Sequence, residues 1–165
     1  MELILKQIHS LLIQHQLTLA VAESCTGGLL AKMLTDFSGS SGYFLLGIVS
    51  YHNQAKIRLL KVPAALIAKE GAVSAPVTRK MAHQVRKLSG ADYGIGITGI
   101  AGPSGGTLLI PVGTVFIALA SPAGCLCRKL FLRGSRASIR RQAALSALQI
   151  LARAVQRQAV RDSPR

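Results

Sequence analysis

The stretch TLAVAESCTGG, residues 18–28, decides the fold class of this chain. Its first half, Thr18 to Ala22, is apolar and partly β-branched, which predicts a buried strand. Its second half is a turn that ends in Gly27 and Gly28, after which residues 29–34 resume helical character. A buried strand that leads through a tight turn into a helix opens an α/β unit, so we expect a sheet flanked by helices.

Strands and helices alternate on both sides of this stretch. Helices are predicted over 3–16, 52–60, 64–70, from 74 through at least 88, and over 135–157, and strands over 43–51, 93–98, 112–120 and 124–132. His52 and Ser74 stand at helix starts, and the helix after Ser74 places Val77, Met81, Val85 and Leu88 on one face. The last two strands form a tight antiparallel pair.

The pattern therefore predicts a single domain over residues 1–165, a three-layer α/β/α domain with a mixed sheet. Only the last four or so residues are expected to be disordered.

The composition excludes several classes of protein. Half of the 165 residues are apolar and 16% are charged, so the chain can bury a core and is not disordered. No apolar run reaches the roughly 18 residues of a membrane span, and the start lacks the features of a signal peptide. Three cysteines are too few for a disulfide framework. We expect a cytoplasmic, reduced protein with no membrane partner.

The net charge of +14 raises the question of a nucleic-acid partner. Aromatic residues make up only 4% of the chain and tryptophan is absent, which argues against a surface that stacks single-stranded bases. Basic side chains near a site would serve a phosphate-bearing small molecule equally well. Nucleic acid is therefore the disfavoured interpretation.

Two familiar motifs do not apply to this chain. Gly94, Gly96 and Gly99 match the spacing of a dinucleotide-binding fingerprint, but the first two fall inside a predicted strand and no helix follows. His9 and His15 are six residues apart, so they do not share a helix face as a metal pair would. We expect neither a metal nor a cofactor.

Ser24 is the most informative residue, because it lies where the first strand passes into a helix. Unpaired N–H groups at a helix start can hold an oxyanion, so a hydroxyl placed there could attack a carbonyl. The simpler alternative is that Ser24 or Thr26 only caps the helix. Cys25 is a rival nucleophile, but its neighbourhood supplies no histidine.

A serine nucleophile needs a base, and Lys56 falls in the first turn of a predicted helix. A partly buried lysine has a lowered pKa and can act as a base, although an exposed charge is the usual state of a lysine. Tyr51 could contact a ligand or lie in the core. The glycine-rich loop 99–106 follows another strand, and ligands gather at the carboxyl ends of strands in open α/β sheets.

Seven motifs occur in order and carry a resemblance to a known family. They are residues 22–28 (AESCTGG), 39–41 (GSS), 50–56 (SYHNQAK), 71–74 (GAVS), 98–106 (TGIAGPSGG), 111–115 (PVGTV), and Arg136 with Ile139-Arg140. The sequence closely resembles the CinA C-terminal domain family, which includes stand-alone nicotinamide-nucleotide amidohydrolases. It departs from the family's usual pattern at residues 107–110, which are Thr-Leu-Leu-Ile here in place of charged residues.

The resemblance implies an amidohydrolase that converts nicotinamide mononucleotide (NMN) to nicotinic acid mononucleotide and ammonia in NAD salvage, without a cofactor, in a homo-oligomer. It implies that Ser24 is the nucleophile, Lys56 its base and Tyr51 a third catalytic residue, and that Arg140 and Arg136 hold the phosphate. The further substrate-binding residues it implies are Thr26, Gly27, Gly28, Ser41, Asn53, Thr98, Gly99, Ala101 and Gly102. The alternatives are a non-catalytic nucleotide-binding module and a basic nucleic-acid-binding protein.

Overall fold

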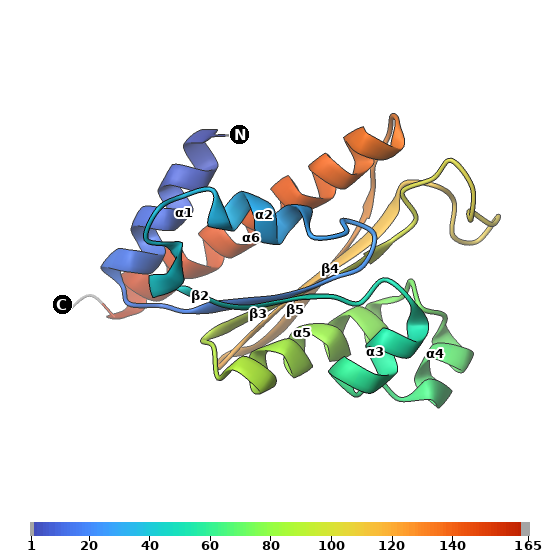
Figure 1. Ribbon diagram of the computed structural model, residues 1–165, viewed down its shortest axis with the longest axis horizontal. Coiled ribbons are helices and arrows are strands. Elements are labelled where there is room, and N and C mark those ends of the chain that lie inside the picture. The colour runs from blue at the N-terminus through green and yellow to red at the C-terminus, as the bar shows by residue number, and fades with distance from the viewer. Residues whose placement is uncertain (1, 163–165) are drawn as a thin grey trace.

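The computed structural model describes residues 2–162, with side chains described up to residue 158. Figure 1 shows the helices and strands in chain order. They are α1 (Glu2–Gln14), β1 (Leu19–Glu23), α2 (Leu29–Thr35), the 3₁₀ turn η1 (Ser40–Gly42), β2 (Phe44–Val49), α3 (Asn53–Leu60), α4 (Ala64–Glu70), α5 (Ala75–Ser89), β3 (Tyr93–Gly99), β4 (Thr114–Ser121), β5 (Gly124–Phe131) and α6 (Arg136–Asp162).

The five strands form one mixed sheet in the order β2-β1-β3-β4-β5. β1 pairs in parallel with β2 and β3, whereas β4 is antiparallel to both β3 and β5. All five residues of β1 are buried, as expected for a strand covered on both faces. Because β1, β2 and β3 run the same way, their carboxyl ends meet at one edge of the sheet.

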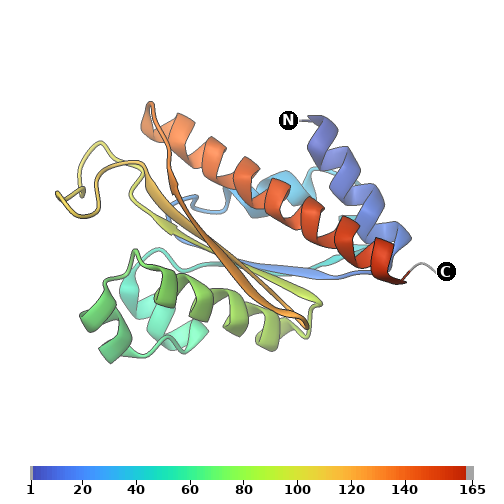
Figure 2. The same cartoon turned by 180° about the vertical axis from the view of Figure 1, so that it is seen from behind.

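Helices cover both faces of the sheet, which confirms the three-layer α/β/α prediction. α1, α2 and α6 lie on one face, and α3, α4 and α5 on the other. Figure 2, the view from behind, shows the long α6 running across the same face of the sheet as α1. The larger core cluster lies under α1, α2 and α6, and includes Leu12, Leu34 and Leu148. A smaller cluster around Met81 and Val85 lies between the sheet and α5.

The predicted elements correspond to those observed, with shifts of a few residues at several ends. β4 begins at Thr114 and not at Val112, because Gly113 has φ +92° and a Cβ there would lie 2.0 Å from the Leu132 carbonyl oxygen. Leu88 shares a predicted helix face with the buried Val77, Met81 and Val85 but is 52% exposed, since it lies in the last turn of α5, just before Gly90 turns the chain toward β3.

The starts of α3 and α5 were predicted at the correct residues, but only the first has a side chain that accepts a helix N–H. His52 caps α3, and its ring accepts a hydrogen bond from the Gln54 N–H. Ser74 is the N-cap residue of α5, but its hydroxyl donates to the Gly71 carbonyl and accepts no helix N–H. Of the four C-terminal residues expected to be disordered, 163–165 lie outside the described residues and Asp162 belongs to α6.

The glycines that matched the dinucleotide fingerprint have a packing role. A Cβ on Gly94 would lie 2.3 Å from the Ala82 carbonyl oxygen, and one on Gly96 would lie 2.5 Å from that of Thr78. Both carbonyls belong to α5, so the two glycines let this helix approach β3 closely.

Candidate active site

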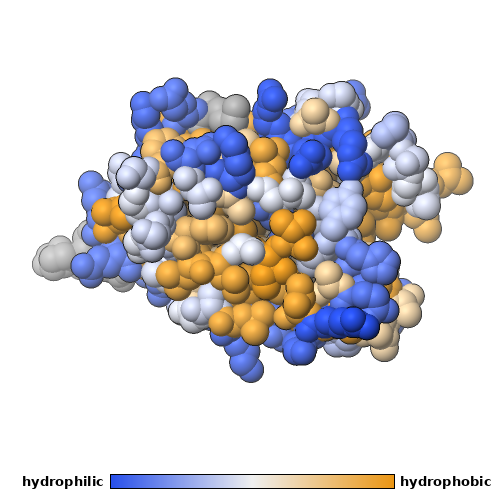
Figure 3. Space-filling view, viewed as in Figure 1, coloured by the Kyte–Doolittle hydropathy of each residue, from blue (hydrophilic) through white to orange (hydrophobic). Residues whose placement is uncertain are grey.

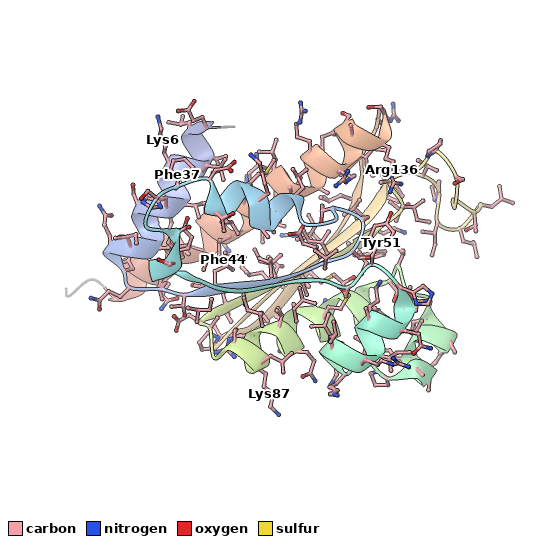
Figure 4. The ribbon with its side chains drawn as sticks, viewed as in Figure 1. Lys6, Phe37, Phe44, Tyr51, Lys87 and Arg136 are labelled. Carbon is pink, nitrogen blue, oxygen red and sulfur yellow. The ribbon has the colours of Figure 1, made fainter. Side chains whose placement is uncertain are left out.

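A pocket of about 320 Å³ opens at the edge where β1, β2 and β3 end. Its volume is at the lower end of the range for small-molecule sites. Figure 4 shows Tyr51 and Arg136 near each other at this edge, far from Phe37 and Lys6. The lining residues are Ser24, Cys25, Tyr51, Asn53, Lys56, Ala72, Val73, Gly99, Ile100, Ala101, Gly102, Ser104, Gly105 and Arg136.

Ser24 and Lys56 form the central pair of this pocket. Lys56 Nζ donates to Ser24 Oγ at 3.1 Å, and also to the carbonyls of Ser50 at 2.8 Å and Tyr51 at 3.3 Å. The His52 cap starts α3 so close to the end of β2 that Lys56, in the first turn, is directed back under the strand end. Its side chain is only 2% exposed.

Burial changes the protonation of this lysine. Removal from water lowers the pKa of the Lys56 ammonium from 10.5 to about 8, because the charged form is penalised. Three oxygen acceptors surround Nζ, and no carboxylate forms an ion pair with it among the described residues. A neutral amine is therefore accessible near physiological pH at hydrogen-bond distance from a hydroxyl, as a general base requires.

Cys25, the rival nucleophile, also lines the pocket. Burial raises the pKa of its thiol from 9.0 to about 11. The thiolate is the reactive form, so this cysteine has the character of an inert core thiol. Ser24, with a base at 3.1 Å, is the better candidate.

The turn after β1 has fewer free amides than the sequence suggested. The Gly27 N–H donates to the Ser24 carbonyl, and the Gly28 N–H donates to the carboxylate of Glu23. These two amides are therefore unavailable for an oxyanion, which corrects that part of the expectation. Among the described residues, the N–H groups of Cys25 and Thr26 have no hydrogen-bond partner.

Sequence reasoning missed Glu23. Its side chain is 1% exposed, and its carboxylate accepts from the N–H groups of Gly28, Leu30 and Ala31 at 3.1, 3.0 and 2.8 Å. The sequence did carry an indication of this role: Glu23 is the single acidic residue between an apolar strand and a helix, in a chain with only six acidic residues. Glu23 lies five residues before Gly28, outside the spacing of ordinary caps.

The two arginines have different positions. Arg136 lines the pocket and donates to the Gly102 carbonyl at 2.7 Å and to the Tyr51 hydroxyl at 2.6 Å. Arg140 does not line it: its Nε and Nη2 both donate to the Thr26 carbonyl, at 3.1 and 2.7 Å. The structure therefore brings Arg136 to the pocket and places the Arg140 guanidinium on the main chain of the turn after β1, so the phosphate contact expected of Arg140 stays a prediction.

Thr98 and Ser41 do not join the pocket. The Thr98 hydroxyl is buried against the Thr78 hydroxyl at 2.7 Å, on the α5 side of β3. Ser41 precedes β2, whereas the pocket lies beyond the other end of that strand, so the strand register separates Ser41 from Ser24. Four other expected residues line the pocket; they are Asn53, Gly99, Ala101 and Gly102.

The pocket also has walls that the sequence analysis did not assign. Ala72 and Val73, between α4 and α5, contribute an apolar side, and Ser104 and Gly105 contribute to the rim. Nowhere in residues 2–162 do three His, Cys, Asp or Glu side chains gather as a metal site would require. Within the same part of the chain, no helix is both long and apolar enough to cross a bilayer.

Known proteins share both the sequence family and the fold of this chain. A family model described as the CinA C-terminal domain matches residues 1–155. The chain belongs to the CinA C-terminal domain family. This confirms the resemblance found in the sequence motifs.

Two curated relatives of this CinA-type domain are longer proteins. A CinA-like protein of Geobacter sulfurreducens is 55% identical over 137 residues, 83% of this chain and 33% of the relative. A putative competence-damage inducible protein of a Thermoanaerobacter species is 50% identical over 143 residues, 87% of this chain and 35% of the relative. The chain thus spans about a third of the length of the curated relatives it matches.

Solved structures of the family share the fold over the whole domain. A CinA superfamily protein from Klebsiella pneumoniae superimposes with a TM-score of 0.90 at 30% identity, covering 93% of this chain and 96% of that one. A competence/damage inducible protein from Agrobacterium tumefaciens gives 0.86 at 35% identity, covering 93% and 95%. The mixed five-stranded sheet and its helices are thus the family fold.

Proposed function

We propose that this CinA-type domain is an amidohydrolase that converts NMN to nicotinic acid mononucleotide and ammonia. The observation that carries the proposal is the pair of Ser24 Oγ and Lys56 Nζ, 3.1 Å apart at the base of a pocket. The pKa of Lys56, lowered to about 8, supplies the base that a serine nucleophile needs. The family resemblance supplies the substrate.

The first step is acylation of Ser24. Ser24 Oγ attacks the carboxamide carbon, neutral Lys56 takes the hydroxyl proton, and the carbonyl oxygen becomes an oxyanion. The N–H groups of Cys25 and Thr26, which have no hydrogen-bond partner among the described residues, are the donors that we assign to that charge. Lys56 then returns the proton to the leaving nitrogen, so ammonia departs and an ester to Ser24 remains.

The second step is hydrolysis of that ester. Lys56, neutral again, takes a proton from a water molecule that attacks the acyl carbon, and the bond to Ser24 Oγ breaks as the oxygen regains a proton. The product is the carboxylate of nicotinic acid mononucleotide. Arg136, whose guanidinium lines the pocket, is the cation placed to meet the phosphate, by exchanging its contacts with Tyr51 and Gly102.

The decisive assay follows both products from NMN. Purified protein is incubated with NMN, ammonia is measured enzymatically, and nicotinic acid mononucleotide is measured by chromatography. We expect the two products in equal amounts, and neither from the Ser24→Ala variant. NMN binding without turnover would identify a non-catalytic binding module. Salt-sensitive DNA binding without turnover would favour the nucleic-acid alternative.

The proposal includes self-association, which the family resemblance implies. Light scattering coupled to size-exclusion chromatography gives the mass in solution. We expect a multiple of the 17.4 kDa chain, and a monomeric mass would contradict this part of the proposal.

A further inference from the structure

Glu23 has an unusual place for an acid in a strongly basic protein. Its carboxylate is buried and ends at the start of α2, where Oε2 accepts from Gly28 and Leu30 and Oε1 from Ala31. No salt bridge to Glu23 occurs in the described part of the chain. The N–H groups at the start of α2, which have no acceptor within the helix itself, and the positive dipole end of the helix therefore take the place of a cation.

The main chain of Glu23 reaches the other half of the catalytic pair. Its carbonyl oxygen accepts from the Ser50 N–H at 2.7 Å and the Ser50 hydroxyl at 3.3 Å. The Ser50 carbonyl in turn accepts from Lys56 Nζ at 2.8 Å. One residue is thus bonded covalently to Ser24, tied by its side chain to the turn that follows, and linked through Ser50 to the base.

We propose that Glu23 is a positioning residue that holds the Ser24 hydroxyl in line with Lys56. Three N–H bonds to one carboxylate draw the start of α2 back onto the end of β1, which fixes the path of residues 24–28 between them. The proposal rests on the proposed function only in taking Ser24 as the nucleophile. The N–H groups at the start of α2 already donate to Glu23, so they are not available to bind an anion of the substrate.

Catalysis therefore depends on a small range of positions of Ser24 Oγ relative to Lys56 Nζ. A displacement of about 1 Å between reacting groups lowers a rate on the order of 100-fold. Glutamine at position 23 has nearly the same shape, but it replaces one acceptor oxygen with an NH₂ group that would face a backbone N–H. At least one of the three hydrogen bonds is lost, and the turn is expected to relax away from Lys56.

The test measures the reactivity of Ser24 without the natural substrate. Phenylmethylsulfonyl fluoride sulfonylates an activated serine: Oγ attacks sulfur, fluoride leaves, and the base takes the hydroxyl proton. Mass spectrometry locates the label on Ser24, and Ser24→Ala supplies the blank. For Glu23→Gln we expect labelling to slow about 10- to 100-fold. With NMN, kcat should fall similarly while KM stays within about twofold.

Two further variants separate positioning from a general loss of structure. Glu70→Gln changes an exposed acid at the end of α4 and should leave the labelling rate unchanged. Glu23→Asp keeps the charge but is one methylene too short to reach all three N–H groups, so it should retain an intermediate rate. Circular dichroism and thermal melting establish the folded fraction of each variant, and rates are expressed per folded protein.

Several results would overturn the proposal. A folded Glu23→Gln protein that is labelled at the wild-type rate would make Glu23 a purely structural residue. The same conclusion follows if neither variant folds, or if KM rises as much as kcat falls. Labelling of wild-type Ser24 without NMN turnover would instead refute the proposed function, while the positioning role would still be measured by the labelling rates.

Discussion

The turn after β1 and the loop after β3 are both rich in glycine, and both border the same pocket. The turn, residues 24–28, is held from two sides, by the Glu23 carboxylate and by two donors from Arg140. The loop, residues 100–113, is fixed at its base and by the contact of Arg136 with Gly102. Its far end extends away from the molecule (Figure 1).

Glycine content alone therefore does not locate the catalytic groups. The turn suits the proposed nucleophile because its hydrogen bonds fix it on the end of a buried strand, and catalytic groups require such support. The loop contributes backbone and small side chains to the rim of the pocket, which suits substrate recognition more than bond breaking. Each of the following predictions changes one side of this contrast.

Ser24→Ala removes the proposed nucleophile from the turn after β1 and should have the largest effect. Loss of a nucleophilic serine lowers kcat by roughly 10⁴- to 10⁶-fold. Lys56 retains the carbonyls of Ser50 and Tyr51, so the melting temperature should change little. Product formation from NMN and thermal melts check both statements. Near-normal activity would shift the role to Cys25, which the double variant with Cys25→Ala would then test.

Lys56 should give the activity its pH dependence. In the proposed mechanism the neutral amine is the base, so kcat/KM should rise as pH increases through about 8 and level off above it. Lys56→Arg keeps the charge but cannot lose its proton, so it should be nearly as inactive as Lys56→Ala. The pH–rate profile is the measurement. A flat profile from pH 6 to 9, or an active arginine variant, would reduce Lys56 to an electrostatic role.

The same shift predicts how stability depends on pH. The pKa of Lys56 is lower in the folded protein, about 8, than in the unfolded chain, near 10.5, so the unfolded chain binds more protons between these values. The contribution of Lys56 to the free energy of unfolding therefore increases from pH 8 to 10.5. Thermal melts of the wild type and Lys56→Met across this range isolate it, and equal slopes would contradict the shifted pKa.

Much of this architecture could be predicted from the sequence, because it depends on local patterns. α4 was predicted over residues 64–70 and is found there, and the hairpin of β4 and β5 follows its turn residues. Lys56 could be singled out because its place in the first turn of a helix after a strand follows from spacing alone. Periodicity and turn chemistry act over a few residues, so a single sequence carries them.

Contacts between distant segments could not be predicted in this way. Arg140 reaches the Thr26 carbonyl across 114 positions of the chain, and its target depends on how α6 packs over the turn. The Thr98 hydroxyl forms a hydrogen bond with the Thr78 hydroxyl, because the Thr98 side of β3 faces α5. Ser41 belongs to a motif of the family, but strand register places it at the opposite end of β2.

Substitution of Arg136 should mainly affect substrate binding, whereas substitution of Arg140 should mainly affect the catalytic step. Arg136→Ala should raise the KM for NMN by about 30-fold, equivalent to roughly 2 kcal/mol for one charge-assisted contact. The effect should be small for nicotinamide riboside, which lacks the phosphate. Arg140→Ala releases the Thr26 carbonyl, so it should lower kcat more than it raises KM. Steady-state kinetics on both substrates measure these changes.

Arg157 provides the matched control for the two arginines. It is exposed near the far end of α6, so Arg157→Ala should leave both kinetic constants unchanged. Equal losses on NMN and the riboside in Arg136→Ala would exclude a phosphate contact. A rise in KM confined to Arg140→Ala would instead mean that Arg140 binds the phosphate, as expected from the sequence.

The smallest effect is expected at the tip of the loop after β3. Leu108 and Leu109 are 103% and 87% exposed, and the protruding loop carries apolar surface at the right edge of Figure 3. Since neither side chain contributes to the core, the double variant Leu108→Ser with Leu109→Ser should alter the free energy of unfolding by no more than about 0.5 kcal/mol. NMN turnover should stay within about twofold, because the pocket lining from this loop stops at Gly105. Chemical denaturation measures the free energy of unfolding, and steady-state kinetics measure NMN turnover.

A larger change in the free energy of unfolding or in turnover would mean that Leu108 and Leu109 make contacts in solution. The tip of the loop would then be held in place by contacts, as the turn after β1 is.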